Sequence, residues 1–214
     1  GRLLNVRTVL EGSIRSDGSN IRLTAQLINV EDGYHIWSQT FDKELKDIFA
    51  IQDEISGRVA AALAASLKID APAPRRRAYA PDIAAYDAYI LGRAQRIPPT
   101  PQNLAAALES FQAAMRIDPK FAGGYAGAAY VHVLLYEFSS FSPAVAEENL
   151  QTALRLAEAA LQLDPEFGPA WGEYAEVLSK LGRHGAALDA IDKAIERAPS
   201  DALMRGYRAR YLGY

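Results

Sequence analysis

The sequence predicts an α+β fragment at the N-terminus followed by an all-α solenoid of helical hairpins, so that the chain is mainly helical. Residues 6–41 alternate apolar and polar side chains with the period of two that is typical of half-buried strands. From residue 83 onward, apolar residues recur three or four positions apart, and a motif that ends in proline returns along the chain. These observations divide the 214 residues into a fragment at 1–70, a proline- and arginine-rich linker at 71–82 and a helical array at 83–214.

The N-terminal fragment is expected to contain three strands in an antiparallel meander. Asp17-Gly18 is a strong signal for a tight hairpin turn, because both residue types accept the positive φ that such a turn requires. Glu31-Asp32-Gly33 predicts a second turn before an aromatic and β-branched strand at 34–41.

A helix should follow from about Lys46 and cover one face of the sheet. Asp42 or Asp47 is expected to cap its N-terminus. Three strands and one helix make a thin domain, so we expect the rest of its sheet to lie before Gly1 in a longer parent protein. The apolar stripe that predicts this helix is formed by Ile48, Ile51, Ile55, Val59, Leu63 and Leu67.

The helical array contains an internal repeat whose copies end in proline. Residues 114–121 (AMRIDPKF) return as 160–167 (ALQLDPEF), and a third copy lies at 194–199 (AIERAP). Proline ends a helix because it lacks an N–H group and disfavours the helical conformation in the residue before it. From Pro165 to Pro199 the period is 34 residues.

This pattern resembles the tetratricopeptide (TPR) repeat, a pair of antiparallel helices with the same period. In the third hairpin, Trp171 opens the first helix, Ala175 allows close packing and Gly182 makes the turn. The resemblance covers residues 83–214 and implies about three hairpins plus one truncated helix. The second hairpin is longer by twelve residues, and we place this insertion at 136–143 (YEFSSFSP) as an aromatic loop.

Residues 1–70 resemble part of a second family, the second half of the TolB-like amino-terminal domain. That domain precedes TPR arrays in many bacterial class III adenylate or guanylate cyclases, and it also occurs in membrane-linked winged-helix transcription regulators. The resemblance implies a regulatory piece of a bacterial signalling protein, with a cyclase as parent and the sensor region of such a regulator as the alternative. The segments that carry it are VLEGSIR at 9–15, RLTAQLI at 22–28, HIWSQ at 35–39 and DIFAIQDEI at 47–55.

Composition and motifs argue against several other functions. The net charge of −3 provides no basic field to hold nucleic acid, and the absence of cysteine removes thiolate catalysis and Cys-based zinc sites. No apolar run approaches the roughly 20 residues of a membrane span. His35, His132 and His184 have no partner at metal-ligand spacing, and no phosphate loop or nucleophile motif is present. We therefore expect a non-catalytic fragment without a metal or cofactor.

The remaining candidate site is the concave groove that the first helices of stacked hairpins form. It is expected to hold a protein or peptide that carries both apolar and charged residues. Tyrosine and arginine are frequent interface anchors, whereas acids stand where chaperone-binding TPRs carry the bases and amides of their carboxylate clamp. The aromatic insertion around Phe138 and Phe141, or the sheet, is the alternative surface. The groove residues are Tyr89, Arg93, Tyr130, Glu173, Glu176, Lys180, Tyr207 and Arg210.

Two further expectations concern assembly and location. Uncovered faces on the sheet and on the last helix should favour self-association into a homo-oligomer. We expect a cytoplasmic protein, or a periplasmic one if the parent carries a membrane span upstream.

Overall fold

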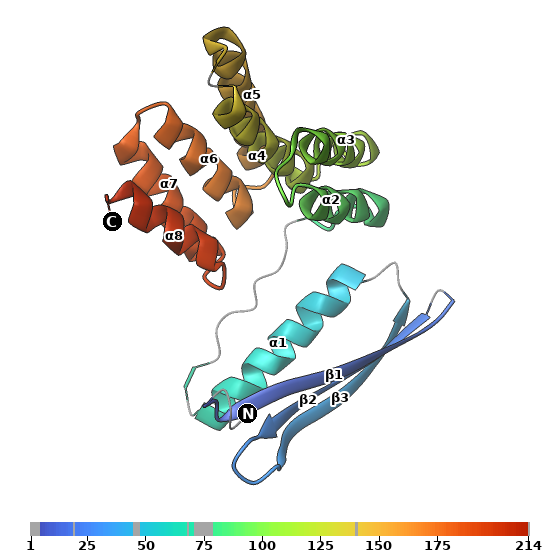
Figure 1. Cartoon of the computed structure of the whole chain (residues 1–214). Helices are drawn as coiled ribbons and strands as arrows, with labels where there is room; N and C mark the ends of the chain where they lie inside the picture. Colours follow the sequence, from blue (N-terminus) through green and yellow to red (C-terminus); the bar gives the residue numbers. More distant parts are fainter. Residues whose placement is uncertain are drawn as a thin grey trace. The chain divides into compact units, whose positions relative to one another are not determined.

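The chain divides into two compact units, Gly1–Ala80 and Pro81–Tyr214. Figure 1 shows a strand–helix layer in the first unit and paired helices in the second. Most of the expected linker, residues 71–78, lies outside the described part of the chain. The computed structural model describes residues 5–18, 20–44, 48–67, 69–70, 79–139 and 141–213.

The first unit contains the expected antiparallel meander, with strands β1 (Thr8–Asp17), β2 (Asn20–Asn29) and β3 (His35–Glu44) in the order β1-β2-β3. Asp17 pairs with Asn20 at the end of the first hairpin, and Gly18 has a φ of 60° there. The second turn places Gly33 at a φ of 71°, a conformation that glycine adopts without steric cost.

Helix α1 (Ile48–Leu67) packs against β3, as the apolar stripe predicts. Phe49 and Ile51 of the helix are buried, as are Leu27 and Phe41 of the sheet. Asp42 does not cap the helix. It lies in β3, where its carboxylate accepts hydrogen bonds from Arg22 of the neighbouring strand. Asp47, the other expected cap, lies outside the described residues.

The face of the sheet that packs against α1 is exposed to solvent along β1. Leu10 is opposite Leu27 and Ile14 is opposite Leu23, so both β1 side chains lie on the face that carries the buried residues of β2. Even so, Leu10 is 53% exposed and Ile14 is 68% exposed. The described helix of this unit therefore covers only part of the sheet.

The second unit is a series of helices that pair as antiparallel hairpins: α2 with α3, α4 with α5, and α6 with α7 (Figure 1). A last helix, α8, packs against α7. We call α2, α4, α6 and α8 the inner row, because each of these helices also contacts the next member of the row. The bounds are α2 Ile83–Gln95, α3 Pro101–Ile117, α4 Ala122–Phe138, α5 Pro143–Leu163, α6 Gly168–Lys180, α7 His184–Arg197 and α8 Ala202–Tyr211.

Each repeat ends in a proline, and the carbonyl oxygen of that proline accepts a hydrogen bond from a side chain of the helix that follows. Tyr125 donates its hydroxyl hydrogen to the carbonyl of Pro119 at 3.2 Å, and Trp171 donates its indole N–H to that of Pro165 at 2.7 Å. These donors hold equivalent places in their repeats, six residues after the proline. The repeat in the sequence therefore corresponds to the same hydrogen bond at equivalent positions of two repeats.

The insertion in the second hairpin differs from its expected form. Helix α4 continues through Phe138 and α5 starts at Pro143, so the extra residues lengthen two helices rather than form an aromatic loop. These helices have 17 and 21 residues, against 13 and 14 in the next hairpin. Phe141 lies in the short connection and is 100% exposed.

Candidate functional site

The inner row contains a cleft of about 90 Å³. Side chains from all four helices of the row line it, together with Phe111 of α3 and Asp201 beside α8. Small residues make room for it, since Ala126 and Gly127 are the α4 residues that face it beside Tyr130. We call it the inner-row cleft. Besides Phe111, its polar and aromatic lining consists of Tyr89, Arg93, Arg96, Tyr130, Glu173, Asp201 and Tyr207.

The structure brings together most of the side chains that the sequence singled out. Five of the eight predicted residues line the inner-row cleft, and these are Tyr89, Arg93, Tyr130, Glu173 and Tyr207. The remaining three, Glu176, Lys180 and Arg210, form an ion cluster between α6 and α8. Sequence reasoning missed Arg96 and Asp201, although Arg96 follows Arg93 by three residues and so continues its helical face.

Arginine side chains stack on the tyrosine rings of the inner row. The guanidinium carbon of Arg96 lies 4.0 Å from the centroid of Tyr130, and that of Arg93 lies 5.7 Å from the centroid of Tyr89. Arg210 similarly lies 4.9 Å from the ring of Tyr207. Stacking uses the flat face of the guanidinium and leaves its N–H groups directed along the plane. The cleft therefore presents positively charged donors held in place by aromatic rings.

Glu173 is the acidic group of the inner-row cleft. Its Oε2 atom is buried and has no hydrogen-bond partner among the described residues. Burial raises the pKa of Glu173 to about 8, an effect that Arg96 opposes and that Glu176 and Asp201 reinforce. At neutral pH its carboxyl group is thus mostly protonated, and it can donate a hydrogen bond as well as accept one.

Glu176 is the acid of the neighbouring ion cluster and is 5% exposed. It accepts hydrogen bonds from Arg210 and, at 2.7 Å, from the hydroxyl of Tyr211, and Lys180 lies 3.7 Å away. Its charge is therefore balanced within the protein. The two acids that the sequence placed in the groove consequently differ in state, since Glu173 is mostly neutral and Glu176 is paired.

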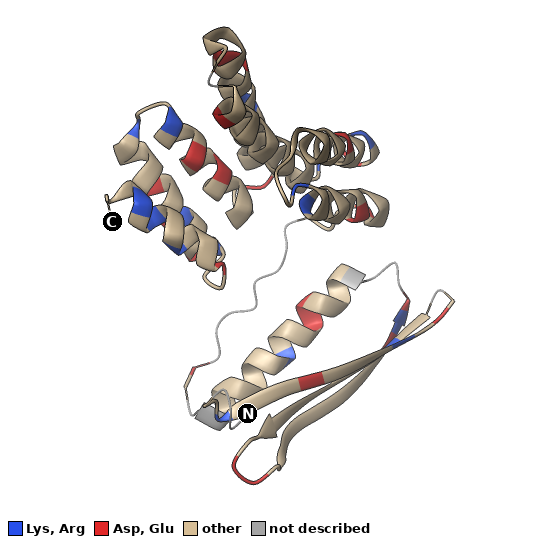
Figure 2. Cartoon of the chain, in the orientation of Figure 1, with Lys and Arg blue, Asp and Glu red and all other residues tan. Residues whose placement is uncertain are grey.

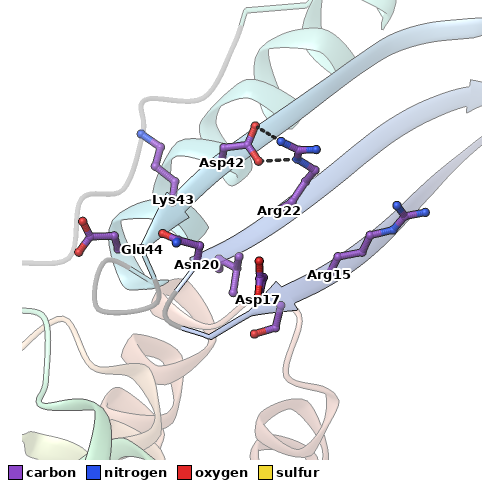
Figure 3. A pocket seen from close by; sticks show the side chains of 9 residues that line it. Arg15, Asp17, Asn20, Arg22, Asp42, Lys43 and Glu44 are labelled. Atoms are coloured by element: carbon purple, nitrogen blue, oxygen red, sulfur yellow. Dashed lines mark hydrogen bonds and ion pairs between the residues drawn. The ribbon is translucent and has the colours of Figure 1, made fainter.

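The first unit carries a second depression, lined by the strand ends shown in Figure 3. Arg22 and Asp42 point toward one another there and form an ion pair, while Arg15 lies apart on β1. Apart from Ile21, the side chains that line it are exposed. It is an open polar surface without a buried group to orient a ligand.

Other kinds of site find little support in the described part of the chain. The residues described there include no cluster of three side chains that could hold a metal ion. No helix among them is long and apolar enough to cross a membrane. In Figure 2, the charged residues of α8 are all basic, whereas α6 carries acidic residues and a lysine at its end.

Comparison with known proteins identifies the repeat. Residues 144–211, which lie within the second unit, match the family model of the tetratricopeptide repeat. "Putative adenylate cyclase 3" of Rhizobium meliloti (strain 1021) is 34% identical over 125 residues, which cover 58% of this chain. The match spans only 21% of that relative's length.

Solved structures with a similar arrangement are also TPR domains. The Arabidopsis OM64 TPR domain aligns with a TM-score of 0.46 at 16% identity, over 60% of this chain and 93% of that chain. The Sgt2 TPR domain from Aspergillus fumigatus aligns with a TM-score of 0.47 at 18% identity, over 64% of this chain and 82% of that chain.

Proposed function

We propose that this chain is a non-catalytic, protein-binding regulatory region, and that a peptide or protein segment of its partner binds in the inner-row cleft. The observation that carries the proposal is the convergence of tyrosines from α2, α4 and α8 on one cleft with two arginines of the first hairpin. Stacked helical repeats present extended concave binding surfaces. Tyrosine and arginine are also the residue types that most often dominate binding energy at interfaces.

The charges of the cleft indicate what a partner must offer. Arg93 and Arg96 make no ion pair with a described acid. In contrast, Lys180 and Arg210, which were also expected to contact the partner, already pair with Glu176. The α2 side of the cleft is therefore the side on which new charge pairs can form. Tyrosine rings beside it offer apolar contact.

We further propose that the parent protein is a signalling protein of the adenylate or guanylate cyclase type. The similarity to a protein named as a putative adenylate cyclase supports this, and so does the TolB-like pattern of residues 1–70. The complete gene should then encode a cyclase catalytic domain, whereas a winged helix would indicate the alternative, a sensor region of a transcription regulator.

We also propose that the chain self-associates through the open face of β1 and that the protein is cytoplasmic.

A capture experiment tests the binding surface. The protein serves as bait, and the affinity of a recovered partner is then measured for Arg93→Ala, Tyr130→Ala and the control Arg116→Ala, which changes an exposed residue of α3. Loss of an anchor should cost about 2 kcal/mol, or about 30-fold in affinity, while the control leaves affinity unchanged. Unchanged affinity in both cleft variants would reject this surface and favour the region of Phe138 and Phe141 or the sheet of the first unit.

A further inference from the structure

Two residues that line the inner-row cleft each have a buried polar atom without a hydrogen-bond partner in the described part of the chain. These atoms are Nε of Arg96 and Oε2 of Glu173. They come from different hairpins, since Arg96 follows α2 and Glu173 lies in α6, yet both line the same space. Buried polar groups in native proteins are nearly always hydrogen-bonded. This pair therefore points to a polar group of a ligand as the shared partner.

The state of Glu173 decides what that group can be. Burial raises its pKa to about 8, so its carboxyl group carries a proton at neutral pH. The groups facing it are Arg93 and Arg96 from the α2 side, Tyr89 and Tyr130, Glu176 on its own helix, and Asp201 and Tyr207 from the α8 side. The arginines favour the ionised form and the two acids oppose it. Arg96 Nε–H and the protonated carboxyl group are then both hydrogen-bond donors.

Two unpaired donors on residues that line one cleft require an acceptor, and the surroundings favour an anionic acceptor. A cationic group would enter beside Arg93 and Arg96, both positively charged. The faces of Tyr89 and Tyr130, which could otherwise hold a cation, already carry these guanidinium groups. A carboxylate suits the donors better, because it can accept from both at once. The space of about 90 Å³ admits one small group rather than a length of peptide.

We propose that the inner-row cleft binds one carboxylate side chain of the partner, an aspartate or glutamate, held between the Nε–H of Arg96 and the carboxyl group of Glu173. This inference rests on the proposed function, since it names the chemistry of the peptide that the cleft receives. The carboxylate also balances the charge of Arg96. No proton leaves the site, because Glu173 keeps its own and shares it in the hydrogen bond.

A pair of short peptides tests the inference without knowledge of the natural partner. Both are acetylated and amidated, and they differ only in a central glutamate or glutamine between leucines. The glutamate peptide should shift the Arg96 Nε–H signal in the ¹H–¹⁵N spectrum and bind about tenfold more tightly than the glutamine peptide. Arg96→Gln should remove this preference, while Arg116→Gln on the exposed side of α3 should leave it unchanged.

The pH dependence separates the role of Glu173 from simple attraction to arginine. Binding of the glutamate peptide should weaken as the pH rises from about 7 to about 9, because Glu173 loses its proton near pH 8 and then repels the ligand. Glu173→Gln keeps a neutral donor, so it should retain binding and lose this pH dependence.

Two results would overturn the inference. One is equal binding of both peptides, and the other is tighter binding of a lysine counterpart, which would make Glu173 the ligand of a cation. Equal loss of binding with pH in Glu173→Gln would likewise exclude the protonated carboxyl group. If partner capture still depended on Arg93 and Tyr130 while the glutamate peptide showed no preference, the proposed function would stand and this subsite alone would fail.

Discussion

Phe111 is fully buried where the first hairpin meets the second, and two glycines make room for its ring. A Cβ atom added at Gly127 would lie 2.3 Å from the ring, and one added at Gly92 would lie 2.8 Å from it. Both distances are far below van der Waals contact. Gly127→Ala should therefore lower the free energy of unfolding by about 1–3 kcal/mol, measured by urea denaturation followed by helical circular dichroism.

Gly185 provides the matched control in α7. No heavy atom lies within 4 Å of a Cβ added there, so Gly185→Ala should change only the helix propensity. Alanine in place of an exposed helical glycine stabilises by about 0.5–1 kcal/mol. Equal effects of the two substitutions would show that Phe111 does not require the space at Gly127.

Glu173 should also leave a signature in the pH dependence of stability. Its pKa is raised from 4.5 to about 8 in the folded protein, so between these values the folded state holds a proton that the unfolded state has lost. The free energy of unfolding then falls as the pH rises from about 4.5 to about 8. Below this range the carboxyl group is protonated in both states, so its burial costs no stability through ionisation. Glu173→Gln should flatten that fall relative to the wild-type protein in urea midpoints taken from about pH 5 to pH 8. Parallel curves would contradict the raised pKa.

At the residue scale, the sequence singled out five of the side chains that line the inner-row cleft but not their charge states. Tyr89 and Arg93 were predictable because they lie four residues apart on one face of a periodic helix, although Tyr89 is itself buried. Arg96, the C-cap residue of α2, was missed although its spacing of three from Arg93 continues the same helical face. The pairing of Glu176 with Arg210 depends on how α8 packs on α6, which spacing along the chain does not encode.

Among the helices, α8 relies on Glu176 for a polar attachment to α6. Removing this carboxylate in Glu176→Ala would leave the hydroxyl of Tyr211 without its acceptor and free the charge of Arg210. An interaction of this kind contributes about 1–3 kcal/mol. Amide hydrogen exchange in α8 should therefore accelerate by about tenfold or more, with a smaller effect in α2 and α3.

Glu158→Ala is the control for this attachment, because Glu158 is an exposed acid on α5. It should leave exchange in α8 unchanged. If α8 exchanged at the same rate in Glu176→Ala as in the wild-type protein, Met204 and its apolar neighbours would hold the helix without help from the ion cluster.

The elements differ in how far local pattern determines them. Helix ends near Pro119, Pro165 and Pro199 were predictable because proline fixes them. The form of the insertion was not, because aromatic and serine residues at 136–143 are compatible with either a loop or longer helices. Helix α4 continues there against α5, where Val133 and Leu150 pack together. Packing of α4 against α5 therefore determined that residues 136–143 mainly extend the helices, a choice that local helix propensity left open.

On the scale of the whole molecule, repetition made the fold predictable. Each hairpin buries its apolar face on the next, so recurrence of the motif was sufficient to predict a solenoid. The N-terminal meander was equally predictable from alternation and turn residues. The open face along Leu10 and Ile14 is consistent with the expectation of a thin domain. Which partner binds the cleft depends on a second molecule, and the sequence of this chain does not contain that information.

The most direct measurement of the central claim is site-specific photo-crosslinking of the native partner. A benzophenone side chain placed at Arg93 lies at the inner-row cleft, whereas the same group at Arg116 lies on exposed α3. If a peptide segment of the partner binds in the cleft, the crosslinked partner should appear from position 93 and be absent from position 116. Crosslinking of the same partner from position 116 alone would contradict the claim.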